Sequence, residues 1–128
     1  MITPRIEIDL DKIAHNARVL KNLYRSKGID IMCSTKVVCG DVKISKVLVE
    51  SGISGLCDSR MSNIIKIHNT DINATLVLLR TPLISQTELV VKYVDISLNS
   101  EILVIKELSK YARKYKTLHK IILMVELG

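Results

Sequence analysis

The stretch IDIMCSTKVVCGD, residues 29–41, decides the fold, because a short apolar run ends there in a lysine and then in a glycine. The run from Ile29 to Thr35 has the length and composition of a buried strand. It would bring Lys36 to the carboxyl end of that strand, where chemistry gathers in α/β proteins. Partial burial of an amine favours its neutral, nucleophilic form, so Lys36 is a candidate for imine chemistry. The competing interpretation is that Lys36 reaches water from an ordinary strand end, the commoner fate of a lysine.

A unit of one apolar strand and one amphipathic helix repeats along the chain, without a long linker or a low-complexity segment. Strands are predicted at about 6–10, 29–35, 53–58, 74–80, 95–99 and 120–126. Helices are predicted at about 11–25, 43–51, from 59 onward, 85–93 and 101–114. This alternation, with strands starting about 21 to 25 residues apart, is typical of a parallel sheet.

The fold class predicted from this pattern is α/β, a partial (β/α)8 barrel of TIM type. We expect about five parallel β/α units, preceded by an N-terminal strand and helix. Eight units need about 200 to 250 residues, so a barrel cannot close within these 128 residues. Residues 1–128 are therefore interpreted as a single, truncated N-terminal portion of a barrel domain. The alternative is an open doubly wound sheet, a common solution at this length.

The predicted helices have residues suited to N-capping and an apolar face that would pack inward. Asp41 and Ser59 are expected N-caps, and Ser85 with Glu88 has the spacing of a capping box. The apolar stripe expected to face inward from the helix at 101–114 consists of Ile102, Ile105, Leu108 and Ala112.

Composition excludes several classes of protein. The apolar residues are Ile, Leu and Val with no Trp or Phe, as expected of strands buried on both faces. No apolar run approaches the ~18 residues of a membrane helix and the N-terminus lacks a signal-peptide core, so we expect a cytoplasmic protein without a membrane partner. The net charge is +6, but the lysines are dispersed and lack interleaved aromatic residues, which disfavours nucleic acid as a partner.

No metal site is predicted. The cysteines at 33, 39 and 57 and the histidines at 15, 68 and 119 lack metal-ligand spacing. Packing is the expected role of Cys33 and Cys57, and Cys39 either faces the site or packs.

The segment TKVVCGD at 35–41, preceded by RIEIDL at 5–10, resembles the start of the alanine racemase-like (fold type III) family of enzymes that depend on pyridoxal 5'-phosphate (PLP). The similarity is greatest to the ornithine and alanine racemase branch. Further matching segments are DSR at 58–60, LLRTP at 78–82, DISLNSE at 95–101 and KIILMVELG at 120–128. The resemblance covers the whole chain, although the chains of this family are much longer.

The resemblance implies that Lys36 is both the catalytic and the cofactor-binding residue. It would hold PLP as a Schiff base and then act as a base at the α-carbon of the substrate, with the cofactor ring as electron sink. Asp58, Arg80 and Asn99, at later strand ends, are possible pocket residues, and Glu126 ends the last predicted strand. In place of the aromatic residue expected shortly after the lysine, the chain has Cys39 and Gly40, which argues against alanine as the substrate.

Racemisation needs a second acid/base on the opposite face of the substrate. In relatives this is a tyrosine from a C-terminal domain of a partner subunit, so the full-length protein is expected to be a homodimer. The family's phosphate-binding segment lies on later strands. The tyrosines of this chain fall within or beside predicted helices, where packing is their expected role: Tyr24, Tyr93, Tyr111 and Tyr115.

The sequence therefore predicts the N-terminal segment of a PLP-dependent amino-acid racemase of the ornithine/alanine type, inactive in isolation. One alternative is a non-catalytic PLP-binding protein of vitamin B6 balance, with the same barrel and lysine but no second base. The other is a small flavodoxin-like signalling domain, which Asp58 supports poorly because no second acid stands beside it.

Overall fold

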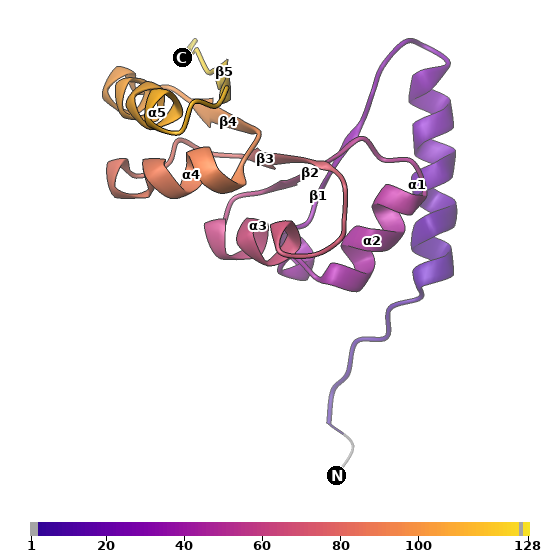
Figure 1. Cartoon of the computed structure of the whole chain (residues 1–128). Helices are drawn as coiled ribbons and strands as arrows, with labels where there is room; N and C mark the ends of the chain where they lie inside the picture. The colour runs from indigo at the N-terminus through magenta and orange to yellow at the C-terminus, as the bar shows by residue number, and fades with distance from the viewer. Residues whose placement is uncertain (1–2, 126) are drawn as a thin grey trace.

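The structure is a computed structural model that describes residues 3–125 and 127–128. Strands and helices alternate along the chain (Figure 1). The helices are α1 (Leu10–Arg25), α2 (Val42–Glu50), α3 (Met61–His68), α4 (Thr87–Tyr93) and α5 (Ile102–Lys114), with short 3-10 turns η1 (Lys36–Val38) and η2 (Ile84–Gln86). The strands are β1 (Met32–Ser34), β2 (Gly55–Asp58), β3 (Thr75–Leu78), β4 (Ile96–Asn99) and β5 (Lys120–Leu123).

All five strands are parallel and lie in the order β1-β2-β3-β4-β5, which is also their order in the chain. Each crossover therefore places the next strand on the same side of the previous one, as in a barrel. A doubly wound sheet reverses this direction at a switch point, so that alternative is wrong. Within the described residues the sheet has two free edges, β1 and β5, and the predicted partial, unclosed barrel is confirmed.

One face of the sheet is buried under the helices. Leu56, Leu76 and Leu78 alternate along β2 and β3 and pack with the inner residues of α3, α4 and α5. Ile64 and Leu108 are the least exposed of those helical residues. The opposite face is only partly covered, since Met32 on β1 is 45% exposed and Ile122 on β5 is 49% exposed. The hydrophobic core therefore lies between the sheet and the helices.

The strand expected at residues 6–10 is wrong. Residues 3–9 lie outside any strand, and Ile6 is 90% exposed. This segment extends away from the helices (Figure 1). Asp9 instead caps α1, since its Oδ1 accepts hydrogen bonds from the backbone N–H groups of Asp11 and Lys12, both at 3.1 Å. Without a neighbouring strand the backbone of this segment has no ladder to join.

Two of the three expected caps are also wrong. Asp41 does cap α2, accepting a 3.0 Å bond from the N–H of Ile44. Arg60, not Ser59, is the N-cap residue of α3. The capping box of Ser85 and Glu88 does not form, because Ser85 lies within η2 and the Glu88 carboxylate instead accepts bonds from Lys114, the last residue of α5, and from Tyr115, which follows it.

The inner face of α5 differs from the prediction as well. Ile102 is 62% exposed, whereas Val104 and Leu108 are buried. The last strand ends at Leu123, and Glu126 lies outside the described residues. Ile102 begins α5, the helix at which the layer over the sheet stops.

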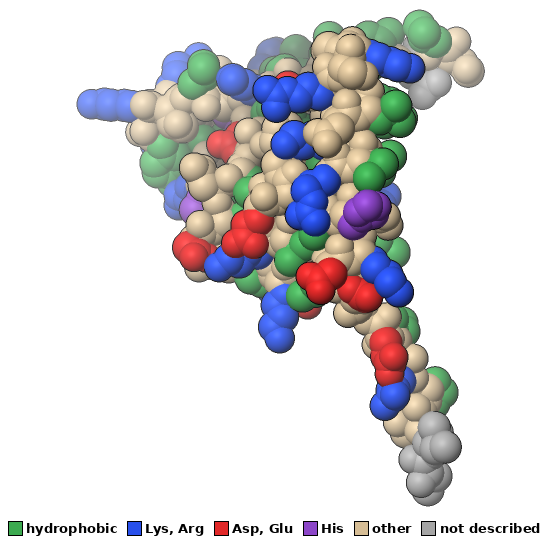
Figure 2. All heavy atoms as spheres, turned by 90° about the vertical axis from the view of Figure 1, so that its right-hand side faces the viewer, with side chains coloured by type: hydrophobic (Ala, Val, Ile, Leu, Met, Phe, Trp, Pro, Cys, Tyr) green, Lys and Arg blue, Asp and Glu red, His purple; other side chains and the backbone are tan. Residues whose placement is uncertain are grey.

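Lysine and arginine side chains are dispersed, as the sequence predicts for the lysines (Figure 2). Figure 2 shows Lys and Arg spread over one face of the molecule, with Asp and Glu gathered toward the end from which the N-terminal segment leaves. Among the described residues, no helix is long and apolar enough to cross a membrane.

Candidate functional site at the carboxyl ends of the strands

Lys36 lies in a compact turn, residues 35–41, which we call the Lys36 turn. Its backbone folds on itself: the N–H groups of Val38 and Gly40 donate to the carbonyl of Thr35 at 3.1 and 3.0 Å, and that of Cys39 donates to Lys36 at 3.2 Å. Cys39 and Gly40 both adopt left-handed backbone angles, with φ of 52° and 60°. The turn leads directly from β1 into α2, so its shape determines where the lysine backbone lies.

A buried carboxylate lies behind this turn. Asp58, at the end of β2, is 1% exposed and accepts three hydrogen bonds. Its Oδ2 accepts from Thr35 Oγ1 at 2.8 Å and from Asn63 Nδ2 at 3.1 Å, and its Oδ1 accepts from the N–H of Arg60 at 2.9 Å. We call the side chains of Thr35, Asp58 and Asn63 the Asp58 network. It joins the end of β1, the end of β2 and the first turns of α3.

The far end of the Lys36 turn rests on α3. Gly40 lies so close to Asn63 that a Cβ on Gly40 would meet the Asn63 Cβ at 2.8 Å. In addition, Lys66 Nζ donates to the carbonyl of Cys39 at 2.8 Å. The turn is thus held at both ends by the unit that follows it in the sequence.

Lys36 itself is exposed, so the expectation that its amine is poorly hydrated is wrong for this chain. The sheet is open, and neighbouring side chains such as Val37, 89% exposed, are equally uncovered. A residue at the carboxyl end of a strand is shielded from solvent only where further strands or helices surround it. The structure therefore places a primary amine at the carboxyl end of β1, on an anchored turn and accessible to a reagent from solution.

Arg80 follows β3 and borders a separate hollow of about 280 Å³. Arg60 and Gln86 line the same hollow, so two arginine residues border it. Guanidinium groups bind carboxylates and phosphates through paired hydrogen bonds. Arg80 is thus placed where an anionic group has access to it.

Asn99, at the end of β4, is fully buried on the helix side of the sheet. Its Nδ2 donates to the carbonyl of Ser97 at 3.0 Å and to Ser97 Oγ at 2.9 Å, while Oδ1 has no partner within the described part of the chain. Ser97 Oγ lies 2.8 Å from His119 Nε2, and His119 Nδ1 lies 3.1 Å from the carbonyl of Val94. A carbonyl only accepts, so Nδ1 bears the proton and Nε2 accepts from Ser97 in the neutral ring. Burial lowers the pKa of His119, which favours this neutral form.

The predicted site residues thus fall into three places. Asp58 lies directly behind the Lys36 turn, and Arg80 borders its own hollow. Asn99 is on β4, two strands away from Asp58, and its side chain bonds Ser97 of the same strand. Sequence reasoning missed Thr35 and Asn63. Asn63 is a polar residue among the apolar inner positions of α3, and that irregularity is the signal that would have identified it. Among the described residues, no cluster of His, Cys, Asp or Glu is arranged to hold a metal ion.

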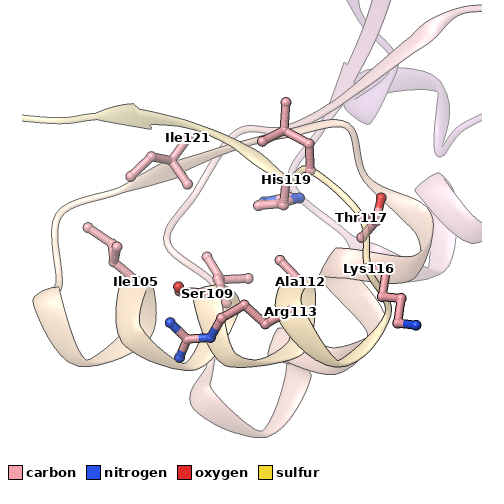
Figure 3. A pocket seen from close by; sticks show the side chains of 10 residues that line it. Ile105, Ser109, Ala112, Arg113, Lys116, Thr117, His119 and Ile121 are labelled. Carbon is pink, nitrogen blue, oxygen red and sulfur yellow. The ribbon is translucent and has the colours of Figure 1, made fainter.

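A further hollow, of about 490 Å³, lies elsewhere, between α5 and the segment leading into β5. Figure 3 shows Ile105 and Ala112 of α5 on one side of it, and His119 and Ile121 on the other. It is formed on the helix side of the last strand, where the helix layer stops. The Lys36 turn does not contribute to its lining.

The family described as alanine racemase, N-terminal domain, matches residues 8–128 of this chain. The chain belongs to that family. The resemblance read from residues 35–41 and the later segments is therefore confirmed, and with it the racemase-type N-terminal domain. Family membership also agrees with the strand order, since the sheet follows a barrel path.

Two curated relatives are racemases. The chain is 38% identical over 125 residues to ornithine racemase of Acetoanaerobium sticklandii, covering 98% of this chain and 35% of the relative. It is 34% identical over 128 residues to lysine racemase of Thermotoga maritima, covering 100% of this chain and 36% of the relative. The chain thus spans about a third of the length of these relatives.

The same fold occurs in solved structures. That of D-threonine aldolase from Filomicrobium marinum matches with a TM-score of 0.85 at 16% identity, over 99% of this chain and 35% of that one. At this identity the match shows the fold alone.

Proposed function

We propose that this chain is the part of a PLP-dependent amino-acid racemase that contains the cofactor lysine, Lys36. The observation that supports this most is the accessible amine on an anchored turn at the carboxyl end of β1. The two racemase relatives support ornithine or lysine, amino acids with a side-chain amine, as the substrate class. Because the chain spans about a third of those relatives, the activity is proposed for a protein that also contains the remaining two thirds.

The residues present suit the covalent end of such a cofactor. PLP has an aldehyde, and a primary amine such as Lys36 Nζ condenses with it. When bound, the cofactor withdraws electrons from the α-carbon of the substrate. In the proposed mechanism Lys36 Nζ would hold the cofactor, would be displaced from it by the amine of the incoming amino acid, and would then, as a free amine, take or return the α-proton on its own side.

Supporting roles follow from where the other candidates lie. Arg80 is proposed to bind an anionic group, either the substrate carboxylate or the phenolic oxygen of the cofactor, because it borders an open hollow. Asp58 and Asn99 are buried on the helix side of the sheet, so we assign them to support from behind and not to contact with the cofactor.

A racemase also needs a group on the opposite face of the substrate. We propose that this is a tyrosine of a partner subunit in a homodimer of the longer protein, as the family resemblance implies. Tyr24, Tyr93, Tyr111 and Tyr115 lie in or beside α1, α4 and α5, away from the carboxyl ends of the strands. We therefore propose that the 128-residue chain is inactive alone.

The test joins this chain to the remaining two thirds of the ornithine racemase from A. sticklandii, in place of the matching segment. Conversion of L-ornithine, L-lysine and L-alanine to the D forms is followed by chiral chromatography with PLP present. We expect conversion of ornithine or lysine by the joined protein and none by its Lys36→Ala variant. Cofactor binding without conversion of any of the three amino acids would contradict the racemase assignment and support a non-catalytic PLP-binding protein.

A further inference from the structure

We propose that Asp58 is a positioning residue for Lys36, acting through Thr35 and Asn63. This proposal deepens the assignment of Lys36 as the cofactor lysine and rests on it. Asp58 does not contact the lysine. It fixes the turn from which the lysine side chain projects.

Thr35 is the residue immediately before Lys36. Thr35 is fully buried and is bonded to β2 through its backbone and through its side chain. Its N–H donates to the carbonyl of Cys57 at 2.8 Å, and its Oγ1 donates to Asp58 Oδ2 at 2.8 Å, with the Cys57 carbonyl as a second, longer acceptor at 3.3 Å. The backbone bond continues the β1–β2 ladder, and the side-chain bond sets how the chain leaves that ladder. The position of the Lys36 backbone follows directly from these two bonds.

The other end of the Lys36 turn is connected to the same carboxylate. The Oδ2 of Asp58 that accepts from Thr35 also accepts from Asn63 Nδ2. Asn63 in turn packs against Gly40, and Lys66, three residues further along α3, donates to the carbonyl of Cys39. One buried carboxylate therefore connects both ends of the segment 36–38 to the same short helix.

Asp58 is 1% exposed, and a carboxylate is costly to bury unless donors surround it. Here the three donors are a hydroxyl, an amide and a backbone N–H, and no ion pair of Asp58 is recorded among the described residues. Removing one donor leaves the charge undersatisfied, so the network favours a single arrangement of the turn. Such preorganisation of a reacting group is a recognised source of rate.

The experiment compares two threonines. In Thr35→Val, the hydroxyl that binds Asp58 is lost with little change in size. Thr87→Val is the matched control, because Thr87, the first residue of α4, is also fully buried and its hydroxyl also donates a 2.8 Å bond, to the carbonyl of Ile84. Thr35→Ser keeps the hydroxyl, so it should keep the Lys36 turn as it is in the parent chain.

Two readouts are taken on each chain. The first is the rate at which PLP labels Lys36 relative to Lys27, another exposed lysine, after reduction with borohydride and peptide mass analysis. The second is hydrogen exchange of the backbone amides of Val38, Cys39 and Gly40, which needs no cofactor. We expect Thr35→Val to lower the Lys36 preference by about tenfold to a hundredfold and to speed exchange of the three amides. Thr87→Val and Thr35→Ser should match the parent in both.

The outcomes separate the two proposals. If the parent chain shows no preference for Lys36 over Lys27, the cofactor-lysine assignment fails, while amide exchange still tests the network. If the parent prefers Lys36 and Thr35→Val behaves like Thr87→Val in both readouts, the positioning role is wrong. If Thr35→Val does not fold, Asn63→Ala takes its place, and parent-like labelling and exchange in that chain would overturn the proposal.

Discussion

Replacing Gly40 by alanine tests the contact between the Lys36 turn and α3. Gly40 has φ of 60°, and a new Cβ would lie 2.8 Å from the Cβ and 3.2 Å from the Cα of Asn63. Both neighbouring atoms belong to or adjoin the backbone of α3, so neither moves without moving the helix. The helix in turn is tied to Asp58 through Asn63. We therefore expect Gly40→Ala to destabilise the fold and to displace the turn.

The magnitude has two parts. A left-handed alanine costs about 1 to 2 kcal/mol, and overpacking a filled contact costs about 1 to 3 kcal/mol. The total of about 2 to 5 kcal/mol is a large share of the ~5 to 15 kcal/mol by which domains are stable. Gly28 supplies the control, because its φ is 72° but nothing lies within 4 Å of its added Cβ. Gly28→Ala should show the backbone part alone.

The assay is urea unfolding of the parent chain and of the two variants, with free energies of unfolding compared at equal m-values. We expect Gly40→Ala to be about 1 to 3 kcal/mol less stable than Gly28→Ala. Equal stabilities of the two variants would show that the turn does not press on α3, and would refute the anchoring described for Lys36.

Two further predictions concern His119 and the core. Burial lowers the pKa of His119 below its ordinary value of 6.5, so the unfolded chain binds this proton more readily and stability should fall as the pH drops below about 6.5. The free energy of unfolding of His119→Gln, measured across a pH series, should fall less than that of the parent chain. An equal pH dependence in the two chains would contradict the buried, neutral histidine. Leu56→Ala should cost about 2 to 5 kcal/mol in urea unfolding, whereas Ile6→Ala should change stability by no more than about 0.5 kcal/mol because Ile6 is 90% exposed. A large effect at Ile6 would mean that the N-terminal segment packs against the fold.

Much of the fold was predictable because each unit contains its own signals. The apolar run before Lys36, the regular spacing of later runs and the cap at Asp41 are local features, and they correctly gave parallel strands, their alternation with helices and the start of α2. The strand at 6–10 failed because a strand needs a partner, and alternating Ile6 and Ile8 do not reveal whether one is present.

The site was less predictable, because its geometry depends on register and on closure. Successive side chains of a strand point to opposite faces of the sheet, so the face on which a strand-end residue lies depends on its position in that alternation. Asp58 shares the face of Leu56 and Leu78, which points at the helices, and so it lies behind the Lys36 turn instead of in a pocket. The exposure of Lys36 depends on how far the sheet closes, which no local pattern encodes. The sequence marked Thr35 only as the end of a strand. Its bond to Asp58 joins residues 23 positions apart, and a local pattern does not reveal such a contact.

The central claim is that Lys36 is presented as the reactive amine, and the most direct measurement is the site of covalent labelling in the parent chain. PLP is added below the concentration of the chain, the product is reduced with borohydride, and the labelled lysines are quantified by peptide mass. Most of the label should lie on Lys36, and a Lys36→Arg chain should lose it without gaining label elsewhere. Label spread evenly over the exposed lysines, with Lys36 no richer than Lys27, would contradict the account.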